Sequence, residues 1–187
     1  MIVQAVIFYE IERNYKSERA MKNLILLRHA KSSWKDPYLN DHDRPLNKRG
    51  KRDAPVMAGI LKKYFPRPDM IVASPSKRTR ATAEVMAKGL GMDKHDIVYD
   101  KNIYHADAFT LMHIVGDMEN SVNTVLLVGH NPGLTVLANM YAPGITENIP
   151  TCGIVGFRTS QDSWGAFLTK EDIICNGKFY PKSLPSA

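Results

Sequence analysis

The 187-residue sequence predicts an α/β protein, a three-layer α/β/α sandwich whose sheet is mainly parallel with an antiparallel edge. Three short apolar runs, residues 24–27, 70–73 and 125–128, are each bounded by polar residues, as buried strands of a parallel sheet are. Segments with apolar residues at helical spacing lie between these runs, and this alternation is typical of a parallel sheet. The length is sufficient for one hydrophobic core.

The first elements follow from local sequence patterns. We expect a strand at residues 23–27 and a polar loop at residues 31–44. A helix should span residues 47–64, because apolar side chains recur there every three or four positions. Pro55 has no backbone N–H, so this helix should either kink there or begin afresh with Asp53 as its cap.

The middle and end of the chain continue the alternation. Gly89 and Gly91 should end a helix that follows the strand at residues 70–73, and Asp107 should cap a later helix. A pair of strands separated by a polar turn should close the sheet at residues 152–158 and 164–168. The remaining elements are expected at residues 76–88 (helix), 97–99 (strand), 108–118 (helix), 124–128 (strand), 132–140 (helix) and 173–175 (strand).

Residues 1–20 stand apart from this pattern, and we expect them to be an extension from an upstream start, because Met21 directly precedes the first strand. One domain would then cover residues 21–187. Residues 1–9 are mostly apolar but too short to cross a bilayer, and no basic segment precedes them as in a signal peptide. We therefore expect a cytoplasmic protein without a membrane partner. Cys152 and Cys175 form no disulfide framework or metal-ligand spacing.

The formal net charge of +6 raises the question of a nucleic-acid partner. The distribution of charge argues against one, because no Lys or Arg occurs between residues 102 and 157. Positive charge gathers in the first half of the chain instead, as an anionic substrate would require. We expect no nucleic-acid binding.

Cations and imidazoles follow three of the predicted strands. Arg28 and His29 follow the first apolar run, Arg78 lies just after the second, and His130 follows the third. Ligands of open α/β sheets bind beyond the carboxyl ends of the strands, so these four side chains should meet. Two guanidinium groups and two imidazoles suit an anion, and most simply a phosphoryl group.

Each of the four residues then has a chemical role. His29 is the candidate nucleophile, because a neutral imidazole can attack phosphorus with one nitrogen while the other is held as a donor. Arg28 and Arg78 are the candidate phosphate clamps, and Arg78 also lies near a helix N-terminus, where backbone donors attract anions. His130 can donate a hydrogen bond to a phosphoryl oxygen. The alternative for each histidine is a structural one, as a core or capping residue.

Several motifs resemble those of the histidine phosphatase superfamily, also called phosphoglycerate mutase-like. The likeness spans about residues 21–184. It rests on Arg28-His29-Ala30, Ser74-Pro75-Ser76-Lys77-Arg78 with Thr82-Ala83, and Gly129-His130-Asn131-Pro132. The segments Leu27-Arg28-His29-Ala30-Lys31-Ser32-Ser33-Trp34, Asp43-Arg44-Pro45-Leu46 and Arg49-Gly50 are similar to those of SixA-type phosphohistidine phosphatases.

The resemblance implies that His29 is phosphorylated during the reaction and that Arg28, Arg78 and His130 complete the phosphate pocket. It also implies that Arg44 is a further cation on the phosphate side. Neither a metal nor another cofactor is required. The implied partner is a phosphorylated protein, such as a histidine phosphotransfer-type domain in signal transduction, or a small phosphorylated substrate.

The source of the leaving-group proton is left open. Many relatives supply it from a Glu in the middle of the chain, but residues 102–106 hold no carboxylate. Asp36, Asp41 and Asp43 in the loop after His29 are substitutes, and each also fits an ordinary turn residue. A phosphohistidine leaving group can depart as a protonated imidazole, which makes a strong acid less necessary.

The sequence therefore predicts a metal-independent phosphatase that acts through a phosphohistidine intermediate, with phosphohistidine on a signalling protein as the expected substrate. Two alternatives are a phosphatase of small phosphorylated metabolites and a catalytically idle module that binds phosphorylated ligands. A mutase is disfavoured, because the chain lacks room for the additional structure that would hold a phosphorylated sugar acid through two transfers.

Overall fold

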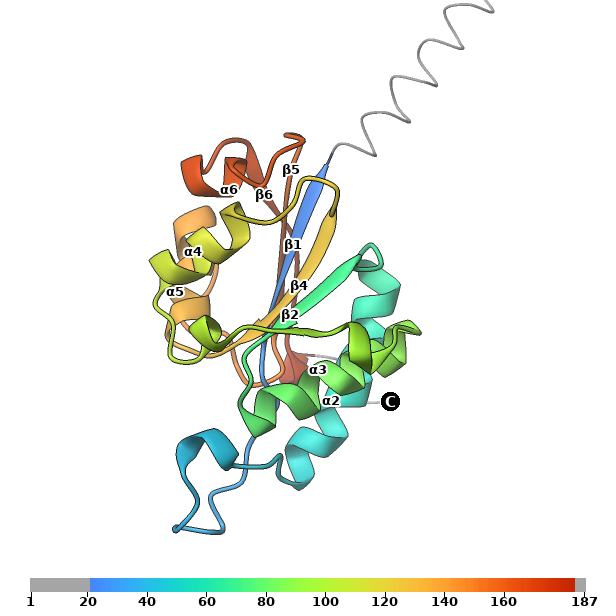
Figure 1. Cartoon of the computed structure of the whole chain (residues 1–187), viewed down its shortest axis with the longest axis vertical. Coiled ribbons are helices and arrows are strands. Elements are labelled where there is room, and N and C mark those ends of the chain that lie inside the picture. The colour runs from blue at the N-terminus through green and yellow to red at the C-terminus, as the bar shows by residue number, and fades with distance from the viewer. Residues whose placement is uncertain (1–20, 184–187) are drawn as a thin grey trace, which may run out of the picture.

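A six-stranded sheet in the order β3-β2-β4-β1-β5-β6 forms the centre of the computed structural model, which describes residues 21–183 (Figure 1). The expected extension at residues 1–20 lies outside the described residues. Strands β1, β2, β3 and β4 are parallel, whereas β5 pairs antiparallel with β1 and β6 pairs antiparallel with β5. The strands are β1 (Lys22–Arg28), β2 (Met70–Ala73), β3 (Val98–Tyr99), β4 (Thr124–Gly129), β5 (Ile154–Thr159) and β6 (Ile173–Phe179).

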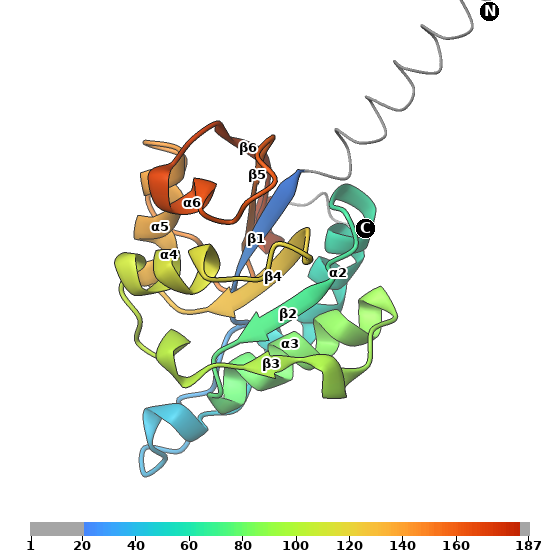
Figure 2. The same cartoon turned by 45° about the horizontal axis from the view of Figure 1, so that its top comes forward.

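Helices cover both faces of the sheet, which confirms the predicted α/β class (Figures 1 and 2). Helices α2 and α3 lie on one face, and α4, α5 and α6 lie on the other. The helices are α2 (Lys48–Tyr64), α3 (Lys77–Leu90), α4 (Ala108–Gly116), α5 (Gly133–Tyr141) and α6 (Ala166–Thr169), with 3-10 turns η1 (Asp41–Asp43), η2 (Lys94–Asp96), η3 (Lys101–Ile103) and η4 (Pro181–Ser183).

Strand β1 is covered on both faces, as its continuous apolar run predicts. Ile25 and Leu27 point into the core under α2 and α3, while Leu24 and Leu26 point into the core under the other helices. All four side chains are fully buried. Successive side chains of a strand alternate between faces, so a strand buried on both sides must be apolar at every position.

Helix α2 begins once, at Asn47, whose side chain accepts a hydrogen bond from the backbone N–H of Gly50. The helix continues through Pro55, so of the two alternatives at that position the fresh start capped by Asp53 is wrong. Asp53 instead pairs with the neighbouring Arg52 at 2.9 Å. The cap at Asn47 makes a second cap unnecessary.

Gly89 does not end helix α3, contrary to expectation. The helix ends one residue before Gly91, which has the left-handed φ of +69° that glycine adopts easily. Gly89 lies within the helix and faces Ala58 of α2, where an added Cβ would lie 2.7 Å from the Ala58 Cβ. Its role is therefore to let the two helices approach each other closely.

The predicted strand at residues 164–168 is wrong, because this segment enters helix α6. Trp164 and Phe167 are fully buried and stack with ring centroids 5.4 Å apart. Their spacing of three places both rings on one side of a helical turn, a pattern that their high strand propensity obscures. The outer partner of β5 is β6, and the observed length of β6, seven residues, exceeds the three that we expected.

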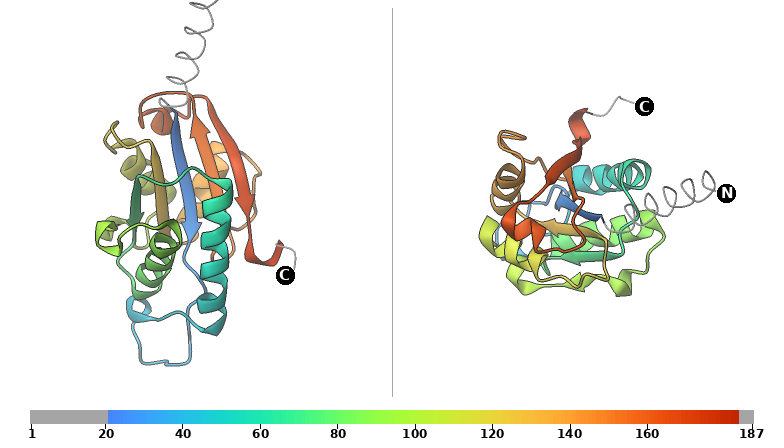
Figure 3. Two further views of the ribbon diagram at one scale, coloured as in Figure 1. Left: turned by 90° about the vertical axis from the view of Figure 1, so that its right-hand side faces the viewer. Right: turned by 90° about the horizontal axis from the view of Figure 1, so that it is seen from above.

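The parallel strands end at one edge of the sheet, and the loop at residues 31–47 projects beyond that edge (Figure 3). Arg28 at the end of β1 lies opposite Gly129 at the end of β4, and Ala73 at the end of β2 lies opposite Val128. This register brings the residues that follow three strands to one place. Within residues 21–183, none of the helices is both long and apolar enough to cross a membrane.

Candidate active site

A cavity of about 380 Å³ lies at this edge of the sheet. The structure brings all four candidate catalytic residues to it, along with one of the three candidate aspartates. The cavity is lined by Arg28, His29, Asp41, Arg78, His105, His130, Asn131 and Pro132. The position of ligand sites beyond the carboxyl ends of parallel strands thus predicted where these four side chains meet, although they are far apart in the sequence.

His29 is held with one ring nitrogen free. Its Nδ1 lies 2.8 Å from the carbonyl oxygen of Ala30, so Nδ1 carries the proton and donates it there. The Nε2 atom therefore keeps its lone pair, and it accepts a hydrogen bond from Nε of Arg78 at 3.3 Å. The backbone supports this position, because the amide of Ala30 donates to Thr82 Oγ1 of α3 at 3.0 Å.

The charge state of His29 suits a nucleophile. Burial lowers its pKa to about 4, and the positive charges of Arg78 and Arg28 act in the same direction, although the hydrogen bond to Ala30 opposes them. The imidazole is therefore neutral at neutral pH. A neutral ring with Nδ1 held as a donor has its nucleophilic lone pair on Nε2.

Arg78 connects the two histidines. It is the second residue of α3, and its side chain is buried with its guanidinium in the cavity. Besides donating to His29, it donates from Nη2 to Nδ1 of His130 at 3.3 Å. The N-terminus of α3 adds unpaired backbone donors at the same place, so the region attracts anions through both side chain and helix.

Arg28 reaches the cavity from the end of β1. Its Nη1 donates to the carbonyl oxygen of Ile149 at 2.7 Å, which fixes the guanidinium plane. Its buried Nε has no hydrogen-bond partner among the described residues. A buried donor without a partner is rare and costly, and an anion in the cavity would satisfy it.

His130 faces His29 across the cavity, with ring centroids 5.1 Å apart. Its Nε2 donates to Ser74 Oγ at 2.8 Å, because Nδ1 already accepts from Arg78. Burial lowers its pKa to about 3, with His29 and Arg78 adding to the effect. His130 is therefore neutral at neutral pH, and its Nδ1 can accept a proton.

Asp41 is the carboxylate that the structure brings to the cavity. From η1 it accepts hydrogen bonds from Nη2 of Arg78 at 2.8 Å and from the hydroxyl of Tyr104 at 2.9 Å. Nε2 of His105 lies 3.5 Å from the same oxygen. Burial opposes ionisation, but bonds from Tyr104, Arg44 and Arg78 outweigh it and hold the pKa of Asp41 well below its usual range. A carboxylate thus occupies the Arg78 clamp.

The structure does not bring Asp36 or Asp43 to the cavity. Asp36 accepts from the backbone N–H of Tyr38 at 3.0 Å, as a turn residue does, and Asp43 lies 3.2 Å from the ring of His42. Both aspartates are exposed. Asp36 and Asp43 therefore fit the alternative interpretation, that of ordinary turn residues.

Arg44 is buried beside the cavity but does not line it. Its guanidinium donates to Ser32 Oγ at 2.6 Å, to the carbonyl of Ser33 at 3.0 Å and to Asp41 at 2.7 Å. It also lies 3.2 Å from the ring centroid of Trp34. In this arrangement Arg44 organises the loop and positions Asp41 instead of facing an incoming anion directly.

Sequence reasoning missed the contributions of Tyr104, His105 and Asn131. The first two follow β3 and η3, so they reach the same edge as the residues after the other parallel strands. Strand β3 has only two residues, too few for a clear alternation of apolar and polar positions. Asn131 follows His130 directly, and its place in the third motif was a signal that could have identified it.

Comparison with known proteins identifies the family. The sequence pattern of the histidine phosphatase superfamily (branch 1) matches residues 24–104. An uncharacterized chloroplastic protein of Arabidopsis thaliana is 34% identical over 151 residues, covering 76% of this chain and 69% of that protein. The chain belongs to the histidine phosphatase superfamily. An uncharacterized protein of Mycobacterium tuberculosis is 33% identical over 144 residues, covering 72% of this chain and 87% of its own.

Solved structures of SixA proteins share the fold of this superfamily member. The candidate phosphohistidine phosphatase SixA of Agrobacterium tumefaciens superposes with a TM-score of 0.73 at 27% identity, covering 86% of this chain and 98% of that one. The protein histidine phosphatase SixA complexed with tungstate gives a TM-score of 0.71 at 20% identity, over 86% and 97% of the two chains. The family and this likeness support a phosphatase.

Proposed function

We propose that this protein removes the phosphoryl group from phosphohistidine on a protein, and that it does so through a phosphorylated His29. The observation that carries the proposal is the neutral His29 imidazole, whose free Nε2 lies 3.3 Å from Nε of Arg78 inside the cavity. A nucleophile beside a guanidinium is what phosphoryl transfer needs, since the reaction depends on positioning and on charge stabilisation.

In the first step, the Nε2 lone pair of His29 forms a bond to phosphorus, and the phosphorus–nitrogen bond of the substrate breaks. Its electron pair stays on the substrate nitrogen, and a substrate ring that is already protonated on its other nitrogen departs as neutral imidazole. Arg78 and Arg28 bind the nonbridging oxygens, where negative charge is concentrated. The bond from Nδ1–H to Ala30 strengthens as His29 becomes cationic.

In the second step, water attacks the phosphoryl group on His29. The phosphorus–nitrogen bond breaks, its electron pair returns to Nε2, and orthophosphate leaves. The neutral Nδ1 of His130 can take the proton from the attacking water, because His130 already gives its other proton to Ser74. His130 then passes its extra proton to the departing orthophosphate or to solvent, and both histidines regain their starting states.

Asp41 has to release Arg78 when a phosphoryl group enters, since both anions use the same guanidinium. Loss of that partner and the approach of a dianion both raise the pKa of the Asp41 carboxyl. It can then carry a proton toward the leaving imidazole. This supplies a proton donor from the loop in place of the carboxylate that residues 102–106 lack.

The surroundings of the cavity favour a protein substrate. The loop at residues 31–47 carries Trp34 and Tyr38, whose exposed fractions are 72% and 95%. Exposed aromatic side chains are enriched at protein interfaces. Arginine guanidinium groups meet the charge of the phosphate, so the scheme requires no metal ion.

The test is rapid quench with a polypeptide whose histidines have been phosphorylated chemically with labelled phosphoramidate. The wild-type protein should trap acid-labile, base-stable label, and His29→Ala should trap none. The exposed His113 on α4 provides the matched control, and His113→Ala should behave as the wild type. Turnover should survive excess chelator. Full activity of His29→Ala would overturn the nucleophile assignment.

A phosphatase of small phosphorylated metabolites is the second candidate. The cavity volume of about 380 Å³ is in the range of small-molecule sites, which favours it. The ratio of kcat/KM for the phosphorylated polypeptide to that for a panel of phosphomonoesters separates the two. A phosphomonoester with the higher value would favour the second candidate.

A further inference from the structure

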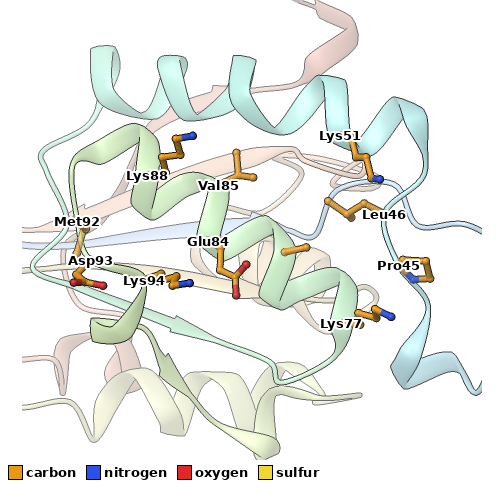
Figure 4. A pocket seen from close by; sticks show the side chains of 11 residues that line it. Pro45, Leu46, Lys51, Lys77, Glu84, Val85, Lys88, Met92, Asp93 and Lys94 are labelled. Carbon is orange, nitrogen blue, oxygen red and sulfur yellow. The ribbon is translucent and has the colours of Figure 1, made fainter.

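A second hollow, of about 810 Å³, lies outside the catalytic cavity along helices α2 and α3 (Figure 4). We call it the α3 groove. Its apolar lining comes from the loop before α2, from α3 and from the segment after α3. These residues are Pro45, Leu46, Ala81, Val85 and Met92. A volume of this size with an apolar floor is that of a binding site and not of a packing defect.

The border of the α3 groove is mainly basic. It contains four lysines and only two carboxylates. The lysines are Lys51, Lys77, Lys88 and Lys94, and the carboxylates are Glu84 and Asp93. The lysines come from both ends of the groove, as Figure 4 shows for Lys77 at one end and Lys94 at the other. An occupant with an apolar face and acidic flanks would therefore be complementary to it.

The α3 groove and the catalytic cavity are lined by residues that are neighbours in the sequence. Lys77 in the groove directly precedes Arg78 in the cavity, and Pro45 directly follows Arg44, which binds Asp41. From Lys77 to Lys88 the axis of α3 rises about 16 Å at 1.5 Å per residue. That length matches about three turns of a bound helix. A helix lying there would begin beside the phosphoryl site.

We propose that the α3 groove docks an acidic amphipathic helix of the phosphorylated substrate protein, with its apolar face on Val85 and Met92 and its carboxylates on the lysines. This inference rests on the proposed function, because the helix is taken to belong to the protein that delivers the phosphoryl group. Helix-in-groove recognition uses apolar contacts for affinity and flanking charge for orientation.

Binding is tested first, with a probe that needs no catalysis. The probe is an unphosphorylated amphipathic peptide of about four turns with Leu on one face and Glu on the other, compared with the same peptide carrying Lys in place of Glu. In the full chain, the Glu peptide should shift amide resonances of residues 77–94 and should bind at least about tenfold more tightly than the Lys peptide. Equal binding, or shifts elsewhere, overturns the inference.

The variant test uses a matched pair with equal change of charge. Lys88→Glu with Lys94→Glu alters the groove, while Lys62→Glu with Lys63→Glu alters exposed lysines of α2 that do not line it. The groove variant should bind the Glu peptide at least about tenfold more weakly than the wild type, and the control variant should bind it with unchanged affinity. Equal loss in both would mean general attraction by net charge and would overturn the docking site.

Activity then separates this inference from the proposed function. The Glu peptide is given one phosphorylated histidine at its end, and free phosphohistidine serves as the small substrate. The groove variant should raise KM for the peptide and leave kcat/KM for phosphohistidine unchanged. Failure of the wild type on both substrates, with the peptide still mapping to residues 77–94, would refute the function but not the docking.

Residues 1–20 of the same chain are the alternative occupant that a competition experiment tests. A synthetic peptide of residues 1–20 that displaces the Glu peptide and binds more tightly would assign the groove to this segment of the protein. That outcome overturns the inference, whereas displacement that requires a large excess supports the acidic helix.

Discussion

At the scale of single residues, the site depends on where protons and charges are held. His29 and His130 have the same side chain, but the Ala30 carbonyl accepts a hydrogen bond from Nδ1 of the first and the Ser74 hydroxyl accepts one from Nε2 of the second. The free nitrogens are therefore different in the two rings, and both face Arg78. One ring can attack while the other accepts a proton.

Replacing Arg78 should slow the reaction strongly. Arg78→Ala removes a guanidinium that contacts both histidines, so kcat/KM for phosphohistidine should fall by two or more orders of magnitude, equivalent to about 3–4 kcal/mol. Arg80→Ala is the control, since Arg80 is exposed and packs on Tyr99 away from the cavity. Steady-state kinetics with free phosphohistidine provides the measurement. A loss under tenfold in Arg78→Ala would contradict the clamp.

Asp41→Asn should have a different profile. The leaving imidazole needs little acid assistance, so kcat/KM for phosphohistidine should fall by less than about tenfold, while that for an alkyl phosphate should fall about a hundredfold. Orthophosphate should bind more tightly, because the variant removes an anion that competes for Arg78. Calorimetric titration and kinetics measure the two effects.

Asp36→Asn and Asp43→Asn serve as controls for that experiment, since both aspartates lie outside the cavity. Both variants should leave kcat/KM unchanged for phosphohistidine and for the alkyl phosphate. If Asp41→Asn, still folded by circular dichroism, loses phosphohistidine hydrolysis as severely as Arg78→Ala, Asp41 is an essential acid. The chemical preference for phosphohistidine would then lose its support.

At the scale of elements, the close packing of α2 and α3 places Arg78 and also forms the groove. Gly89 allows this approach, because an added Cβ there would lie 2.7 Å from that of Ala58. Thr82, one turn after Arg78 in α3, accepts from the amide of Ala30 and so connects this helix to the residue that follows His29. Packing between two helices is thereby linked to the geometry of the nucleophile.

Two glycine substitutions in these helices should have opposite effects. Gly89→Ala should destabilise the protein by about 1–3 kcal/mol through overpacking against α2, which exceeds the gain in helix propensity. Gly59→Ala in α2 has open space around its added Cβ, so it should stabilise by about 0.5–1 kcal/mol. Urea denaturation measures both. A stabilising Gly89→Ala would refute the close approach of the helices.

At the scale of the whole molecule, the sheet brings distant parts of the sequence to one edge and buries the resulting charges. The pKa of His29 is lowered to about 4 and that of His130 to about 3, mainly by burial. The unfolded chain, with ordinary values near 6.5, binds more protons in this range. Folding stability should therefore fall as the pH drops from about 7 toward 4.

Between pH 7 and pH 5 the loss should be roughly 2 kcal/mol for each of these two histidines. His130→Asn should remove about half of this pH dependence, whereas His113→Ala, at an exposed position on α4, should not alter it. Urea unfolding of the three proteins at the two pH values measures the difference. The same free energy of unfolding at both pH values in the wild type would contradict the neutral, buried state of the imidazoles.

The sequence by itself determined the central strands and the meeting of Arg28, His29, Arg78 and His130. Strands covered on both faces must be apolar throughout, and the carboxyl ends of parallel strands share one edge, so these features are local patterns with a necessary spatial result. Asn47 and Asp107 are residue types suited to helix N-caps, and both cap helices in the structure. Of these two caps, only Asp107 was predicted from the sequence.

Only the tertiary structure decided which loop carboxylate reaches the cavity, because Asp36, Asp41 and Asp43 are equivalent in composition and differ in the path of the backbone. It also decided that Trp164 lies in the turn that leads into helix α6, since burial against the neighbouring helices outweighs strand propensity. The proton positions on His29 and His130 belong to this group as well. They depend on acceptors that packing places beside each ring, and a sequence pattern does not specify those distances.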